Sequence, residues 1–396
     1  MNVSRFLLSC STVFMVAAGV VPATAQLRVD QTNLVSDIPG LAKLKDPDLV
    51  NAWGISSGPT LPFWISDNGT GLATLYSFPG SGPPTVSKFP LTVTIPPTAG
   101  GTTSAPTGQV FNGGVGFGGA KFLFDSEDGV ISGWSGGTTA VVDKDFGSAA
   151  VYKGLAIFDP GHSDAVLYAT NFRAGTVEAY DPNFDAPASV TGNFTDPNLP
   201  KGYAPFNDKV INGELYVTYA KQDAEKHDDD AGAGHGFVDI FNLDGTLKER
   251  LISRGALDSP WGLQIAPASF GSVGGDLLVG NFGNGMINAY NPTTGTFVGT
   301  LDGTDGSPLV IDGLWGLTIG NGSAAGGSLD TLFFTAGPNH EMDGLFGSLA
   351  VPEPSTWATL LLGFAGLGLA GYRASRRTAA GRIKGGPKAA LSHLRD

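Results

Sequence analysis

Charged and histidine side chains gather where an otherwise regular sequence is interrupted, between Tyr219 and Phe237. The interruption combines carboxylates, ammonium groups and imidazoles, which can hold a metal ion or act as a general base. A shorter group of the same kind follows near residue 340. The residues are Lys221, Asp223, Glu225, Lys226, His227, Asp228, Asp229, Asp230 and His235, followed by Asn339, His340, Glu341 and Asp343. Of these, Asp228, Asp229 and Asp230 are the candidate metal ligands, for Ca²⁺ or Zn²⁺, although charge runs in loops are usually only solvated.

Four more polar residues recur nine positions before an aromatic residue: Asp67, Asp125, Asn171 and Asn281. A ring of carboxylates and amides at equivalent places in a repeated fold would suit a hard cation such as Ca²⁺. The alternative is that Asp and Asn begin tight turns by bonding to their own backbone, which also predicts repetition. Together with His227 and His340, these four residues form the candidate ligand face.

Two apparent catalytic motifs are excluded by their context. Residues 54–58 match the G-x-S-x-G pattern of hydrolases, but they continue an apolar strand rather than a strand–turn–helix elbow. Gly114, Gly116 and Gly119 match G-x-G-x-x-G, yet no helical pattern follows to receive a phosphate. Both matches arise by chance in a chain with 59 glycines.

The elements that must position these side chains are short strands in a repeated hairpin. Each hairpin is a strand, a tight turn and a second strand that ends in an aromatic residue. In two copies the turn carries an insertion. The first strands of the six hairpins end near residues 67, 125, 171, 219, 281 and 335, a step of about 54. A further strand precedes the hairpins, best seen in the Trp-Gly pairs at 53–54, 261–262 and 315–316.

Six such units predict an all-β, six-bladed β-propeller. The sixth unit stops after its third strand, near Leu349, and residues 27–35 have strand character without a hairpin partner. We expect this N-terminal strand to complete the sixth blade and close the ring. The rhythm of the units resembles that of six-bladed NHL-like propellers. A seven-bladed ring or a pair of packed sheets remains an alternative.

Both ends of the chain read as targeting segments. Arg5 precedes an apolar stretch at residues 6–21, and the small residues that follow predict signal-peptide cleavage between Ala25 and Gln26. At the other end, Pro352, Glu353 and Pro354 precede an apolar run at 358–372 and a cluster of arginines. With Trp357 and Tyr372 as interfacial anchors, this run is long enough to span a membrane as a helix.

The C-terminal arrangement resembles the PEP-CTERM sorting signal of Gram-negative bacteria. The resemblance implies export through the Sec pathway, an inner-membrane-tethered precursor, and processing by an exosortase that releases or anchors the protein at the cell surface. One departure is that 19 residues follow the basic cluster. The predicted divisions are a signal peptide (1–25), the propeller (26–350), the sorting signal with its transmembrane segment (351–377) and a basic cytoplasmic tail (378–396).

Charge restricts the partners of the exported part. Residues 26–350 contain 15 Lys and Arg against 34 Asp and Glu, a formal charge of −19. Such a surface excludes nucleic acid as a partner and disfavours anionic lipid. The one cysteine, Cys10, lies in the leader, so no disulfide supports the exported fold.

The sequence predicts a non-enzymatic surface or matrix protein, a propeller used for binding. The chain also resembles a family of exported propellers that bear the same tail, and an exopolysaccharide partner follows from that resemblance only. The alternatives are a metal-dependent hydrolase or lactonase that uses Ca²⁺ or Zn²⁺, and a purely structural spacer.

Overall fold

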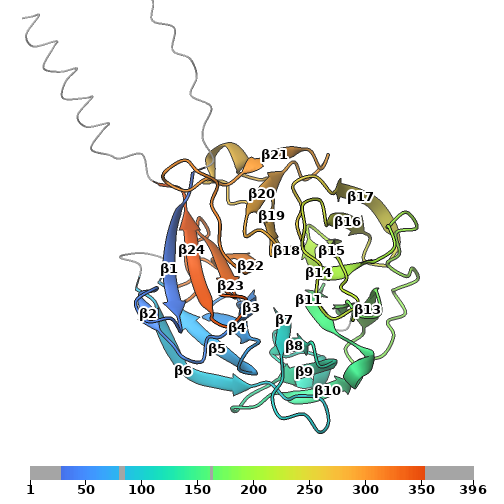
Figure 1. Cartoon of the computed structure of the whole chain (residues 1–396). Coiled ribbons are helices and arrows are strands. Elements are labelled where there is room, and N and C mark those ends of the chain that lie inside the picture. The colour runs from blue at the N-terminus through green and yellow to red at the C-terminus, as the bar shows by residue number, and fades with distance from the viewer. Residues whose placement is uncertain (1–27, 80–84, 161–163, 353–396) are drawn as a thin grey trace, which may run out of the picture.

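The computed structural model describes residues 28–79, 85–160 and 164–352. Within them, six sheets stand radially around one axis (Figure 1). The predicted six-bladed all-β propeller is therefore confirmed, and the seven-bladed ring and the packed sheets are excluded. The predicted signal segment and the C-terminal span lie outside the described residues. Inside them, no helix has the length and apolar character needed to cross a bilayer.

Each blade is a meander that runs outward from the axis. Blade 1 comprises β3 (Ala52–Ser56), β4 (Phe63–Asp67), β5 (Leu72–Ser77) and β6 (Ser87–Thr94). Blade 2 comprises β7 (Pro106–Phe111), β8 (Phe122–Ser126), β9 (Val130–Trp134) and β10 (Val141–Asp145). Blade 3 comprises β11 (Tyr152–Phe158), β12 (Val166–Asn171) and β13 (Thr176–Tyr180).

The second half of the ring repeats the plan. Blade 4 comprises β14 (Tyr203–Ile211), β15 (Glu214–Lys221), β16 (Phe237–Phe241) and β17 (Leu247–Ser253). Blade 5 comprises β18 (Pro260–Ile265), β19 (Leu277–Asn281), β20 (Ile287–Tyr290) and β21 (Phe297–Thr300). Blade 6 contains β22 (Leu314–Ile319), β23 (Leu332–Ala336) and β24 (Leu345–Ala350). Three short 3₁₀ turns complete the described elements, at Phe117–Gly119, Gly147–Ala149 and Gly271–Val273.

The N-terminal strand closes the ring. β1 (Asp30–Ser36) pairs antiparallel with β24, with Gln31 opposite Leu349, and so supplies the fourth strand of blade 6. The short β2 (Leu44–Lys45) adds to β1 in parallel. In Figure 1 the blue β1 lies beside the orange-red β24, so the two ends of the propeller meet in one blade. Pairing β24 in this way removes an open sheet edge, as the sequence predicted.

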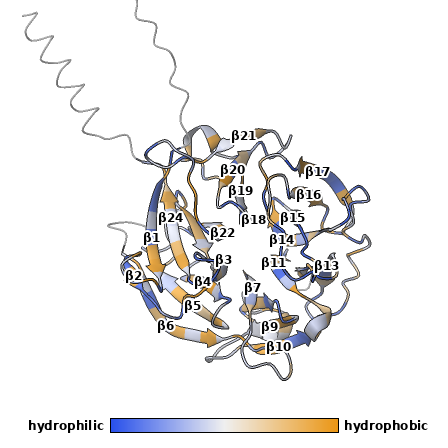
Figure 2. Ribbon diagram, viewed as in Figure 1, coloured by the Kyte–Doolittle hydropathy of each residue, from blue (hydrophilic) through white to orange (hydrophobic). Residues whose placement is uncertain are grey.

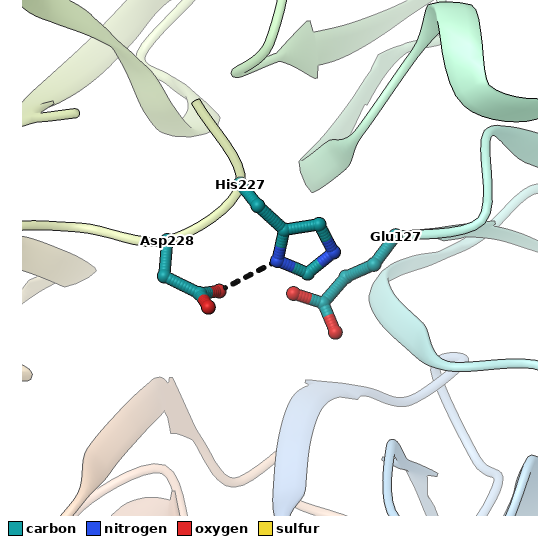
Figure 3. Close-up of side chains that lie close together, drawn as sticks. All are labelled: Glu127, His227 and Asp228. Carbon is teal, nitrogen blue, oxygen red and sulfur yellow. Dashed lines mark hydrogen bonds and ion pairs between the residues drawn. The ribbon is translucent and has the colours of Figure 1, made fainter. Parts of the chain in front are cut away.

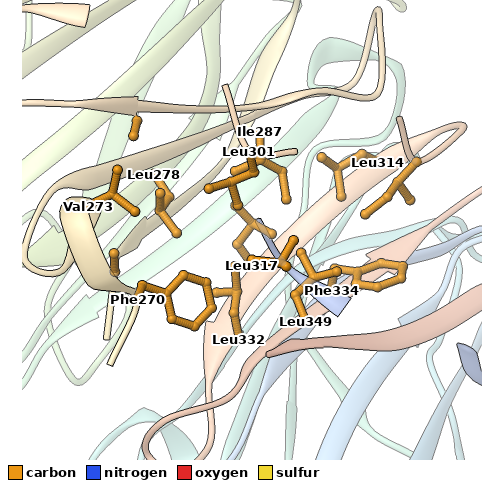
Figure 4. Packing of buried hydrophobic residues seen from close by; sticks show 14 of the residues in the cluster. Phe270, Val273, Leu278, Ile287, Leu301, Leu314, Leu317, Leu332, Phe334 and Leu349 are labelled. Atoms are coloured by element: carbon orange, nitrogen blue, oxygen red, sulfur yellow. The ribbon is translucent and has the colours of Figure 1, made fainter. Parts of the chain in front are cut away.

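Apolar side chains hold the blades together. Figure 2 shows orange residues distributed along the strands of the sheets. The largest cluster fills the space between blades 5 and 6 and includes Phe270, Leu278, Leu317 and Phe334 (Figure 4). All four are buried, and each such side chain stabilises the fold by about 1.5–3 kcal/mol relative to exposure.

A bulge in every innermost strand sets the geometry of the axis. The pairing register shifts near the start of β3, β7, β11, β14, β18 and β22. A β-bulge re-aims a side chain, and here it aligns one residue of each strand at the level of the shift. These residues are Trp53, Thr107, Lys153, Phe206, Trp261 and Trp315. The four aromatic members pack together with Phe172 and Phe282 as a buried plug across the axis, which we call the aromatic plug.

The next residue is glycine in five of the six strands, because the backbones crowd at the axis. A Cβ at Gly54 would lie 2.3 Å from the Thr107 carbonyl oxygen, and one at Gly108 would lie 2.4 Å from the Leu155 amide nitrogen. Neither obstacle is a flexible side-chain tip.

We predict that Gly54→Ala destabilises the propeller by about 3 kcal/mol, because the added methyl must push two inner strands apart. Gly136→Ala is the matched control, since nothing lies within 4 Å of its Cβ position. Urea unfolding of both variants measures the difference. Equal stability of the two would contradict the close approach of the inner strands.

Candidate functional site

The insertion in blade 4 folds back over the axis. It connects β15 to β16, and its own hydrogen bonds shape it: Asp223 Oδ1 accepts from the amide of His227 at 2.8 Å, and the Asp223 amide donates to the Asp228 carbonyl at 2.8 Å. Lys226 adopts a left-handed conformation (φ 55°) between them. This tight turn brings His227 and Asp228 toward Glu127, which lies in the turn after β8 in blade 2 (Figure 3).

These three residues form a compact group. His227 Nδ1 lies 2.9 Å from Asp228 Oδ1, and one ligand atom from each of the three lies within 4.8 Å of the others. Lys153 of β11 contacts two members of the same group, Glu127 and Asp228. Its Nζ donates to Asp228 Oδ1 at 3.1 Å and forms an ion pair with Glu127. The Lys153 side chain is only 2% exposed, whereas that of Asp228 is 64% exposed, so the group has a buried floor and an open rim.

Hydrogen bonds extend the group across the ring. Glu127 Oε2 accepts from Asn68 Nδ2 at 2.9 Å, and Asn68 Oδ1 accepts from Asn51 Nδ2 at 3.1 Å. The Asn51 amide also donates to Glu341 Oε2 at 2.7 Å. We call the seven residues of this network the polar cap: Asn51, Asn68, Glu127, Lys153, His227, Asp228 and Glu341. They come from blades 1, 2, 3, 4 and 6.

The polar cap rests on the aromatic plug. Trp315 Nε1 donates to Asn51 Oδ1 at 3.0 Å, and Trp261 Nε1 donates to the Lys153 carbonyl at 2.9 Å. The Lys153 ammonium lies 5.1 Å from the ring centroid of Trp53, a cation–π distance. The plug therefore fixes the floor of the cap from blades 1, 5 and 6.

The backbone around Glu341 is strained. Asn339, His340 and Glu341 have consecutive φ values of 57°, 57° and 65°, the left-handed region that non-glycine residues rarely adopt. Residues held in this way cluster at functional sites, where surrounding contacts maintain them. Here the strained turn places the Glu341 carboxylate against Asn51.

Electrostatics differ sharply between members of the cap. The hydrogen bond from His227, with Lys153 nearby, holds the pKa of Asp228 well below its usual range. The same bond raises the pKa of His227. Burial raises the pKa of Glu341 to about 7, against the opposing hydrogen bond from Asn51. Burial alone would lower the pKa of Lys153, but Glu127 and Asp228 outweigh it, and the net pKa is raised.

These groups do not fit a resident Ca²⁺ or Zn²⁺. The point between Glu127 and Asp228, where a cation would bind, is taken by the Lys153 ammonium, which already neutralises both carboxylates. His227 Nδ1 is hydrogen-bonded to Asp228 and is therefore not free to bind a metal ion. A metal ion would have to displace a buried lysine before it met a second carboxylate.

The four repeated polar residues lie elsewhere than expected. Asp67, Asp125, Asn171 and Asn281 are all buried inside their blades, at most 3% exposed, and form no open ring. Asn171 Oδ1 accepts from the Ala174 amide at 3.1 Å, as a turn-starting residue does. The reason is positional: each is the last residue of a strand, or the last but one for Asp125, and the side chains that reach the axis, Asn68 and Glu127, follow one or two positions later.

The histidines and aspartates that the sequence predicted to form a site also lie in different places. His227 and Asp228 belong to the polar cap, but His340 is exposed beside it. The three aspartates do not share one point, because the chain turns between them. Asp229 points into the protein, where burial raises its pKa to about 6, and Asp230 forms an ion pair with Lys221.

Sequence reasoning missed Glu127, Asn68 and Lys153. A signal for Lys153 was present, because Lys153-Gly154 occupies the place of the Trp-Gly pairs in three other blades. A charged residue at a repeated aromatic position is a departure that marks a special role. Glu127 and Asn68 had no such signal, since they stand in turns of ordinary composition.

Comparison with known proteins agrees with the fold and the C-terminal motif. Residues 350–377 match the PEP-CTERM protein-sorting motif. "Uncharacterized protein R648" of Acanthamoeba polyphaga mimivirus is 34% identical over 336 residues, covering 80% of this chain and 78% of the relative. "Uncharacterized protein L690" of the same virus is 33% identical over 340 residues, covering 80% and 84%. Among solved structures, an α-L-arabinanase of Penicillium chrysogenum complexed with arabinobiose covers 81% of this chain and 97% of its own, with a TM-score of 0.50 and 10% identity.

The protein is thus a six-bladed β-propeller with a PEP-CTERM sorting motif, which indicates export with a membrane-anchored sorting signal. It belongs to the propeller family that includes the mimivirus proteins R648 and L690. The arabinanase likeness concerns the fold alone.

Proposed function

We propose that the processed propeller acts outside the cytoplasmic membrane as a non-enzymatic binding module, with the polar cap as its ligand face. The observation that carries the proposal is the position of Lys153 between Glu127 and Asp228. An internal ammonium makes the carboxylates a fixed hydrogen-bonding array rather than a metal centre. Such an array, preorganised by contacts from five blades, suits recognition.

A neutral glycan fits this face best. Asp228 and His227 stand on the rim, 64% and 39% exposed, and can bond to hydroxyl groups. The exported part carries a charge of −19, which repels acidic polymers and leaves neutral exopolysaccharide as the favoured class. The sorting motif supports display where such polymers accumulate, and an exosortase is the processing partner that the motif implies.

Processing at Pro352, Glu353 and Pro354 would leave the ring complete. The last strand, β24, ends at Ala350, and its partner β1 comes from the other end of the chain. No strand of the propeller would be lost with the tail. Release or anchoring of an intact binding module is therefore consistent with removal of everything after residue 354.

We predict that Asp228→Asn weakens glycan binding about tenfold, because it removes a charge that orients His227 and accepts from hydroxyls. Asp230→Asn is the matched control on the same loop, since its partner Lys221 lies outside the cap. Binding of the purified protein to an array of neutral and acidic glycans, in the presence of a chelator, measures both. Failure to retain any neutral glycan, or equal loss in the two variants, would reject the proposal.

A metal-dependent hydrolase or lactonase is the second candidate. The grouping of Glu127, His227 and Asp228 within 4.8 Å favours it, and Glu341, with a pKa near 7, could carry a proton at neutral pH. Lys153 weighs against it for the reason given above. Turnover of a glycan or lactone that disappears on chelation would establish this candidate in place of the first.

A further inference from the structure

A second site lies on the axis, on the opposite side of the aromatic plug from the polar cap. The C-terminal halves of the inner strands line a pocket of about 320 Å³, a volume typical of small-molecule sites. Trp261 of the plug forms part of its lining. The lining is mixed: aliphatic residues such as Ile55, Leu155 and Leu317 alternate with polar ones such as Ser56, Gln109 and Thr318.

Blade 4 breaks the pattern of this lining at three consecutive positions. At the first, where the other five inner strands carry glycine, β14 carries Asn207. At the next two it carries Asp208 and Lys209, where the other five strands carry only uncharged residues, such as Leu155 and Ala156 in β11. Asn207 has a structural role, since its Nδ2 donates to the Trp261 carbonyl at 2.7 Å, whereas adjacent Asp and Lys at the next two positions occur in no other inner strand. Polar departures of this kind mark sites rather than cores.

Lys209 brings an unneutralised positive charge to the cavity. Its Nζ donates to Gln264 Oε1 at 2.8 Å and to the Leu317 carbonyl at 3.1 Å, both neutral acceptors. Within the described part of the chain no carboxylate pairs with it. An ammonium has three donors, so one remains for a ligand. Burial lowers the pKa of Lys209 to about 8, with no opposing carboxylate.

Asp208 does not supply the missing charge, although it is adjacent in sequence. Both of its carboxylate oxygens are buried and without hydrogen-bond partners, so neither reaches the cavity surface. Burial and the nearby Asp125 raise its pKa well above the usual range, which favours the neutral acid. The two side chains leave β14 on opposite faces, as successive residues of a strand do.

We propose that the axial cavity binds a small organic carboxylate with an apolar body, whose charged end pairs with Lys209. A charge buried without a partner is costly, and an anionic ligand would supply that partner. The aliphatic part of the lining, which includes Ile55, Leu155 and Leu317, would contact the rest of the molecule. This site is separate from the polar cap, and it does not depend on the function proposed for that face.

Benzoate, benzamide and benzamidine test the proposal, because they share one shape and differ in charge. Calorimetric titration of the purified full chain should detect benzoate, with benzamide weaker and benzamidine not bound. Lys209→Met should weaken benzoate about 10- to 100-fold, the loss of one charge-assisted hydrogen bond. Lys201→Met, at an exposed turn, should leave the affinity unchanged.

Lys209→Arg keeps the charge and guards against a folding artefact. Near-ultraviolet circular dichroism checks that each variant retains the native packing. Benzoate affinity within a few-fold of wild type in Lys209→Arg, beside its loss in Lys209→Met, would support the site. Equal affinity for the three probes, no benzoate binding to wild type, or unchanged binding in a folded Lys209→Met variant would overturn it.

Discussion

The propeller should unfold at a higher temperature at pH 5 than at pH 8, the reverse of the usual acid sensitivity. The cause is a set of buried carboxyls whose pKa values are raised in the folded protein. Asp125 is fully buried, and burial raises its pKa to about 7 from 3.8. Burial likewise raises the pKa values of Asp67 and Asp208 well above the usual range.

The direction follows from proton counts. Between pH 4 and 7 the folded chain holds protons that the unfolded chain has lost, so stability falls as pH rises through this window. For Asp125 alone the difference between 7 and 3.8 corresponds to about 4 kcal/mol at pH 8. Carboxyls with lowered pKa values, such as Asp228, withdraw their stabilisation only below about pH 4. The maximum is therefore expected near pH 5.

Thermal unfolding at pH values from 4 to 9 measures this profile. Asp125→Asn should flatten it, because an amide does not titrate, whereas Asp305→Asn in an exposed turn should leave the profile unchanged. A stability that rises between pH 5 and 8 would contradict the assignment of protonated buried carboxyls.

Lys153→Met should destabilise the protein by about 3–5 kcal/mol. The substitution removes the ammonium but leaves Glu127 and Asp228 facing one another, and an uncompensated charge at a buried site is strongly unfavourable. Guanidinium unfolding measures the loss. The ion pair of Lys221 with Asp230 is exposed, so Lys221→Met is the matched control and should cost at most about 1 kcal/mol.

A double variant separates charge from packing. Adding Glu127→Gln to Lys153→Met removes one of the two opposed carboxylates, and a substantial part of the lost stability should return. If the double variant is no more stable than Lys153→Met, the effect comes instead from the lost contact of the ammonium with the Trp53 ring. The electrostatic account of the polar cap would then fail.

Much of the fold could be predicted from the sequence because it repeats. Hairpins at a step of about 54 residues can bury their faces only against copies of themselves, which leads to a ring of six sheets. The unpaired strand character near residue 30 identified the closing strand, since a three-stranded last blade needs a partner. Those inferences depend on strand patterns, which can be recognised in short segments of the sequence.

The site could be predicted only in part, because it depends on side-chain direction. The repeat correctly indicated which turns and which insertion face the axis, and so His227 and Asp228. It could not show that the last residue of a strand points inward while the next residue points to the axis, as Asp67 and Asn68 do. The bulge that aims Lys153 at the plug is a feature of register, which periodicity alone does not reveal.

Metal content tests the central claim that an internal ammonium holds the place of a cation in the polar cap. The protein is incubated with Ca²⁺ and Zn²⁺, freed of unbound ions by gel filtration, and analysed by elemental mass spectrometry. We predict far less than one ion per chain in wild type. One tightly held ion per chain that is lost in Asp228→Asn would contradict the account.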